Sequence, residues 1–113
     1  MDLSKIYQRY QQIKELYKQA DLQRLGHEWP RGESVKAFVA DVGALVKLTM
    51  GKDGFRDIEN VDEKLKHELA DCLYSVFLIA EKYNVDLEAS FMETMNELES
   101  RSKQNELPKS HSL

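Results

Sequence analysis

Cysteine and long apolar runs are scarce in this sequence, and each scarcity excludes a class of protein. The single cysteine, Cys72, cannot form a disulfide within the chain, so we interpret it as a small core residue. The longest apolar runs are far too short to cross a membrane. The N-terminal residues 1–5 lack the apolar core of a secretory signal. We therefore expect a cytoplasmic protein with no membrane partner.

An excess of positive charge is also missing. The 16 Lys and Arg residues are outnumbered by 20 Asp and Glu residues, which gives a net charge of −4. A general nucleic-acid binder needs a basic surface, so we expect no nucleic-acid partner. A small phosphorylated ligand remains compatible with this charge, because a bound metal ion can offset the ligand's own charge.

The sequence shows no alternation of apolar and polar residues that would indicate β-strands. Apolar residues instead recur every three or four positions, which predicts four amphipathic helices and an all-α fold. We expect the first helix over roughly residues 3–25, ended by Gly26. The length of 113 residues fits one domain, predicted over residues 1–102, with a flexible C-terminal tail over residues 103–113.

The other three predicted helices have recognisable ends. Ser34 is a suitable N-cap for a second helix starting at Val35, and residues 51–54 contain two glycines that stop it. The third helix starts near Val61, is the most apolar, and is expected at the centre of the fold. Asp86 is a suitable N-cap for the fourth.

Two acidic residues in the apolar third helix, Glu68 and Asp71, suggest a functional site. A spacing of three places both carboxylates on one helix face, and acids in apolar surroundings are usually paired or bound to a metal. Asp41 has a similar setting on the second helix and would face them if the two helices pack antiparallel. Such carboxylates suit Mg²⁺, which prefers oxygen ligands. Spacing alone would favour a simpler interpretation, in which the two acids form a buried pair bonded to Lys or Arg, or lie on an exposed face.

With residues 41–45, 68–71 and 82–87 taken together, the chain resembles the MazG-type all-α nucleoside triphosphate pyrophosphohydrolases over roughly residues 27–101. That family carries an E-x-x-E pair on one helix and an E-x-x-D pair on the next, followed by an apolar run and a turn ending in Asp-Leu. The resemblance implies a four-helix bundle completed by assembly into a homodimer or homotetramer.

The acidic pairs of that family are only partly present here. Glu68 and Asp71 match the second pair, and Asp41 matches the first Glu of the first pair. Ala44 replaces the remaining Glu and offers no ligand atom. The resemblance implies that Asp41, Glu68 and Asp71 bind Mg²⁺ or Mn²⁺ and act as the catalytic residues. One carboxylate fewer predicts weaker metal binding.

The implied reaction converts a nucleoside or deoxynucleoside triphosphate to the monophosphate and pyrophosphate, at a rate that Ala44 is expected to reduce. The alternative is a catalytically impaired member of the same fold, acting as a nucleotide-sensing or protein-binding helical module. A helical dimerisation domain unrelated to nucleotides is the third hypothesis.

Four further residues are candidates for substrate binding. Lys82 returns to the helix face of Asp71 about three turns later, although an exposed lysine is the commoner outcome. Asn96 and Arg101 fall where the family often places an Asn and a basic residue that contact nucleotide. Trp29 can stack on a base, or else plug the end of the bundle.

Overall fold

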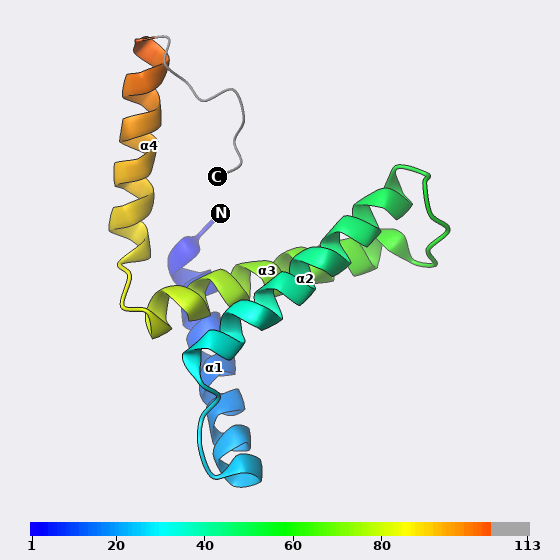
Figure 1. The fold of residues 1–113 in the computed structure, drawn as a ribbon, viewed down its shortest axis with the longest axis vertical. Helices are drawn as coiled ribbons and strands as arrows, with labels where there is room; N and C mark the ends of the chain where they lie inside the picture. The colour runs from blue at the N-terminus through cyan, green and yellow to red at the C-terminus, as the bar shows by residue number, and fades with distance from the viewer. Residues whose placement is uncertain (105–113) are drawn as a thin grey trace. The chain divides into compact units, whose positions relative to one another are not determined.

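The computed structural model describes residues 1–104 and contains four α-helices with no strand in that range (Figure 1). The all-α prediction is therefore confirmed. The helices are α1 (Leu3–Leu25), α2 (Arg31–Lys52), α3 (Val61–Lys82) and α4 (Leu87–Lys103). Beyond Gln104, the predicted tail lies outside the described residues. None of these helices is long and apolar enough to span a membrane.

The described part of the chain divides into two compact units, residues 1–83 and a second unit that begins at residue 84. The first unit contains α1, α2 and α3, and the second contains α4. The single domain expected over residues 1–102 stays a prediction.

Two helix ends predicted from the sequence are formed as expected. Gly26 ends α1 in the left-handed region at φ 77°, and its N–H donates to the Leu22 carbonyl at 3.0 Å. A residue without Cβ adopts this conformation at little cost. Asp86 caps α4, because its carboxylate accepts a hydrogen bond from the Ala89 N–H at 3.0 Å.

The predicted start of the second helix was wrong by one turn. The helix α2 begins at Arg31, directly after Pro30, whose ring presets φ near the helical value. Ser34 therefore lies inside the helix and does not cap it. Its hydroxyl donates to the Arg31 carbonyl at 2.5 Å, which satisfies a buried polar group within the first turn.

The first unit is centred on α3, as predicted. The helices α2 and α3 run side by side as an antiparallel hairpin, and α1 packs across α3 (Figure 1). Leu48 of α2 is buried in the hairpin, while Tyr10 of α1 is buried against the rings of Tyr74 and Phe77. The hairpin brings the middle of α2 against the middle of α3.

A polar cluster centred on Glu81 fixes α1 to α3. The Glu81 carboxylate accepts hydrogen bonds from the hydroxyls of Tyr7 and Tyr10 and forms an ion pair with Lys14 at 2.6 Å. Burial of Glu81 opposes its ionisation, but the hydrogen bonds from Lys14 and the two tyrosines outweigh burial and hold its pKa below the ordinary value. This carboxylate is thus fully satisfied and has a structural role.

Candidate metal centre

Three carboxylates converge at the middle of the α2–α3 hairpin. Asp41 comes from α2, and Glu68 and Asp71 come from adjacent turns of α3. One carboxylate oxygen of each residue lies within 4.8 Å of the other two. Oxygens bound to one Mg²⁺ or Ca²⁺ ion at about 2.0–2.6 Å are separated by roughly 3–5 Å. The spacing of the three groups therefore fits a shared divalent cation.

Glu68 is the least satisfied of the three acids. Its Oε1 atom is buried and has no hydrogen-bond partner among the described residues. Burial raises the pKa of Glu68 above its ordinary value. The neighbouring carboxyl groups of Asp41 and, to a smaller extent, Asp71 raise this pKa further. A buried carboxylate oxygen without a partner is costly, and a cation at this position would satisfy it. The chemistry of the donor set thus agrees with its spacing.

Ser75 and Cys72 complete the surroundings of the acids. The buried Ser75 hydroxyl donates to the Asp41 carboxylate at 3.4 Å, a long hydrogen bond that links the two helices. Sequence reasoning missed Ser75, although it follows Asp71 by four residues and so lies on the same helix face. Burial first, and then the three carboxylates, raise the pKa of the Cys72 thiol. These surroundings keep Cys72 protonated and unsuited to nucleophilic attack.

Ala44 lies beside the cluster without contributing to it. It lines the same surface hollow as Glu68, so the position where the family pattern has a second Glu does face this site. Glu33, an acid in the first turn of α2, is paired with Lys36 at 2.9 Å. Among the described residues the cluster therefore consists of three carboxylates.

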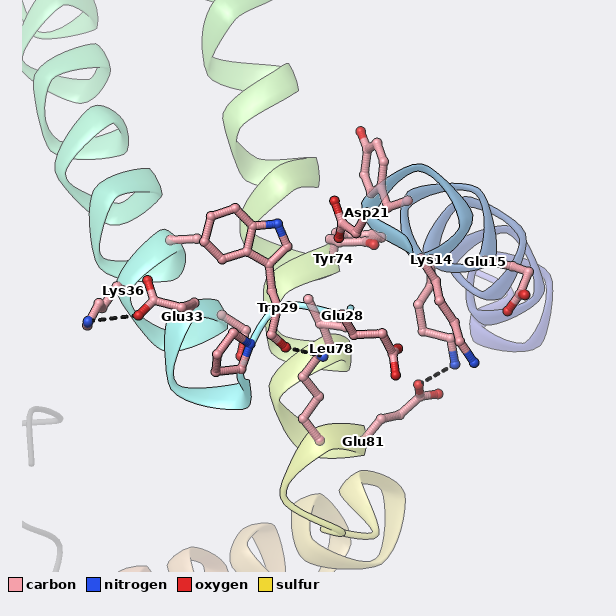
Figure 2. Close-up of a pocket in the computed structure, with 16 residues that line it drawn as sticks. Lys14, Glu15, Asp21, Glu28, Trp29, Glu33, Lys36, Tyr74, Leu78 and Glu81 are labelled. Carbon is pink, nitrogen blue, oxygen red and sulfur yellow. Dashed lines mark hydrogen bonds and ion pairs between the residues drawn. The ribbon is translucent and has the colours of Figure 1, made fainter. Parts of the chain in front are cut away.

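A cavity of about 760 Å³ opens between α1, the segment before α2, and the α2–α3 hairpin (Figure 2). Trp29 and Lys82, two of the predicted substrate-binding residues, both line it. The Lys82 ammonium donates to the Trp29 carbonyl at 3.4 Å. Figure 2 shows the Trp29 indole between α2 and α1, on the side where Tyr74 lies. The structure thus brings Trp29 and Lys82 together in a cavity whose size suits a small molecule.

The other two predicted substrate-binding residues belong to the second unit. Asn96 and Arg101 both lie on α4, and Arg101 forms an ion pair with Glu97 at 2.6 Å, one turn earlier. Their proposed contacts with nucleotide stay predictions.

Comparison with known protein families gives one match. Residues 51–105 match the family described as the MazG nucleotide pyrophosphohydrolase domain. The match confirms the family resemblance and includes Glu68 and Asp71, whereas Asp41 and Ala44 precede it. Neither the curated proteins nor the solved structures gave a match to this chain.

Proposed function

We propose that this protein hydrolyses a nucleoside or deoxynucleoside triphosphate to the monophosphate and pyrophosphate, because residues 51–105 match the MazG nucleotide pyrophosphohydrolase domain. The observation that carries the proposal is the cluster of Asp41, Glu68 and Asp71, whose carboxylate oxygens approach within 4.8 Å. Asp41 lies outside the matched residues, yet the hairpin places it against the two acids inside them. We propose the cytoplasm as the location of this reaction, as expected from the sequence.

The three carboxylates would hold Mg²⁺ or Mn²⁺. When bound, such an ion polarises the phosphoryl group, neutralises negative charge and favours deprotonation of water. Ser75 would help to orient the Asp41 side chain through its long hydrogen bond. Asp71 is the exposed member of the cluster and lies where a phosphate can approach from solvent.

Either Glu68 or Asp41 would orient the attacking water and accept its proton. Both carboxylates belong to the cluster that would hold the ion, so either one is within reach of a water molecule beside it. The water oxygen would bond to the α-phosphorus of the triphosphate. The bridging phosphorus–oxygen bond would break, and pyrophosphate would leave with that electron pair.

The cavity at Trp29 is the proposed position of the base. The Trp29 side chain is 48% exposed, which leaves much of the indole available for stacking. Tyr74 provides a second aromatic surface in the same cavity, and Lys82 provides a positive charge. Stacking of a base on an aromatic side chain contributes about 1–3 kcal/mol and tolerates different bases.

Trp29→Ala is expected to raise KM for the preferred triphosphate about tenfold, because the variant loses a stacking surface worth about 1–3 kcal/mol. The kcat should change little, since Trp29 is not one of the carboxylates that would hold the metal. Steady-state kinetics of pyrophosphate release measures both constants. Trp29→Phe is the matched control and should retain most of the affinity, whereas an unchanged KM in Trp29→Ala would remove Trp29 from the substrate site.

We also propose that the protein forms a homodimer or homotetramer. One side of α2 carries a stripe of exposed apolar residues at helical spacing: Val35, Val39, Val42, Val46 and Met50. This stripe lies on the side of α2 away from Asp41, so a second copy can cover it without blocking the carboxylates.

Light scattering at micromolar concentration should give a mass at least twice that of the single chain. Val39→Asp should lower this mass, because it places a charge in the apolar stripe. A monomeric wild-type protein would contradict the proposal.

The direct test of the proposed activity is pyrophosphate release from a panel of ribonucleoside and deoxyribonucleoside triphosphates with Mg²⁺ or Mn²⁺. The expected result is metal-dependent formation of monophosphate and pyrophosphate in equal amounts. Release of orthophosphate and diphosphate would show cleavage of a different bond. Absence of turnover with every nucleotide, under conditions where the chain is folded, would reject the activity.

A further inference from the structure

Two hollows lie on opposite sides of the carboxylate cluster along the α2–α3 hairpin. The cavity at Trp29 is lined by α2 residues that precede Asp41 and by α3 residues that follow Asp71. A second hollow, of about 690 Å³, is lined by α2 residues that follow Asp41 and by α3 residues up to Glu68. Because α2 and α3 run antiparallel (Figure 1), the residues that line the two hollows place the cluster between them.

The residues lining the two hollows share one face of the hairpin with the acids. At about 100° per residue, Ala37, Ala44 and Lys47 fall on the same side of α2 as Asp41. On α3, the lining residues Lys64, His67 and Tyr74 fall on the same side as Glu68 and Asp71. A ligand can therefore extend from one hollow to the other across the carboxylates.

The second hollow carries positively charged side chains, which the carboxylate cluster lacks. Lys47, Lys64 and His67 line it, and Lys64 precedes Glu68 by one helical turn. Neither Lys47 nor Lys64 forms an ion pair within residues 1–104. Glu63, an acid in the same hollow, is already paired with Lys66 at 3.0 Å. Two ammonium groups are thus free to bind an anion.

Asn60 adds a polar group to this hollow. It occupies the N-cap position of α3 with φ 55°, and its side chain makes no capping hydrogen bond. The amide of Asn60 and the first backbone N–H groups of α3 therefore remain available to phosphate oxygens. Together with the two lysines they form a donor-rich surface on one side of the acids.

We propose that the second hollow is the pyrophosphate subsite, in which Lys47 and Lys64 bind the β- and γ-phosphates of the substrate and then the departing pyrophosphate. This assignment rests on the proposed function for the direction of the nucleotide. The base lies in the Trp29 cavity, the α–β anhydride lies at Asp41, Glu68 and Asp71, and the terminal phosphates lie between Lys47 and Lys64. The positive charges stabilise the charge that develops on the leaving group.

The test uses inorganic pyrophosphate with Mg²⁺ as the probe and isothermal titration calorimetry on the full chain. Lys47→Ala and Lys64→Ala are each expected to weaken pyrophosphate binding at least fivefold. Lys52→Ala is the matched control, because Lys52 is exposed on α2 and is paired with Asp62, and neither residue lines the second hollow. The control should bind pyrophosphate like the wild type.

A nucleoside monophosphate serves as the second probe. Its affinity should be unchanged in Lys47→Ala and Lys64→Ala, because it occupies the Trp29 side of the cluster. Equal pyrophosphate affinity in these variants and the wild type, or an equal loss in Lys52→Ala, would overturn the subsite. Lys47→Gln and Lys64→Gln, checked for an unchanged melting temperature, guard against a folding defect.

The subsite and the proposed activity can fail separately. If no nucleotide is hydrolysed, a selective loss of pyrophosphate binding in Lys47→Ala and Lys64→Ala still supports the subsite. If turnover is present but product inhibition by pyrophosphate is identical in these variants and the wild type, the activity stands and the subsite is rejected.

Discussion

Glu68→Gln is expected to lower pyrophosphate release at least about 100-fold while raising the melting temperature of the metal-free protein. Loss of a residue that only supports a metal ligand lowers metal affinity or activity about 10–100-fold. Glu68 is proposed as a ligand itself, so its loss should cost at least as much. The stability of the metal-free protein should rise, in contrast to the activity. The variant removes a carboxylate whose ionisation is opposed by burial, by Asp41 and by Asp71.

The pH dependence of Glu68 gives this prediction a second signature. The pKa of Glu68 is raised in the folded protein, so the folded state holds a proton that the unfolded state releases. Metal-free stability should therefore fall as the pH rises from the ordinary glutamate pKa through the raised value. A metal ion displaces that proton, so Mg²⁺ affinity should rise over the same interval. Glu68→Gln should abolish both trends.

Thermal unfolding with and without Mg²⁺, across this pH interval, measures both effects on the same samples. Glu59→Gln is the matched control, because Glu59 is exposed in the connection between α2 and α3 and outside the cluster. It should behave like the wild type in activity and stability. Retained activity in Glu68→Gln, or a lower melting temperature without metal, would contradict the role assigned to Glu68.

Ala44→Glu is expected to tighten Mg²⁺ binding about tenfold, because it adds a carboxylate to a site whose affinity depends on ligand number and charge. The position is suitable, since Ala44 lines the same hollow as Glu68. Without metal, the variant should melt at a lower temperature, because four carboxylates repel one another more than three. Turnover at subsaturating Mg²⁺ should rise accordingly.

Ala44→Gln separates the added charge from the added side chain. It has nearly the same size as Glu and offers an oxygen, but it carries no negative charge. Calorimetric titration with Mg²⁺ should therefore show most of the gain in Ala44→Glu and little in Ala44→Gln. Equal affinities in the wild type and both variants would show that residue 44 does not face the metal site.

Local sequence patterns were sufficient to predict the helices and most of their ends. The apolar spacing, Gly26 after α1 and Asp86 before α4 all act through bonds within a few residues, so they are readable without the tertiary structure. The start of α2 was mispredicted because two signals competed. Ser34 resembled an N-cap, but Pro30 initiates the helix one turn earlier.

The candidate site was only partly predictable. The spacing of Glu68 and Asp71 indicated a shared helix face, and the structure brings Asp41 to them across the hairpin. The unpartnered Glu68 oxygen, the Ser75 hydrogen bond and the two hollows depend on how α2 and α3 pack against each other. Such features arise between residues distant in sequence, so periodicity carries no signal for them.

The most direct test of the metal site is a titration of the full chain with Mn²⁺ in the absence of nucleotide. Electron paramagnetic resonance measures the concentration of free Mn²⁺ at each step. If Asp41, Glu68 and Asp71 form one divalent-cation site, Mn²⁺ binding should be saturable. This binding should be competed by Mg²⁺ and weakened at least about 100-fold in Glu68→Gln, as expected for loss of a ligand. Mn²⁺ binding of equal strength in the wild type and Glu68→Gln would contradict the claim.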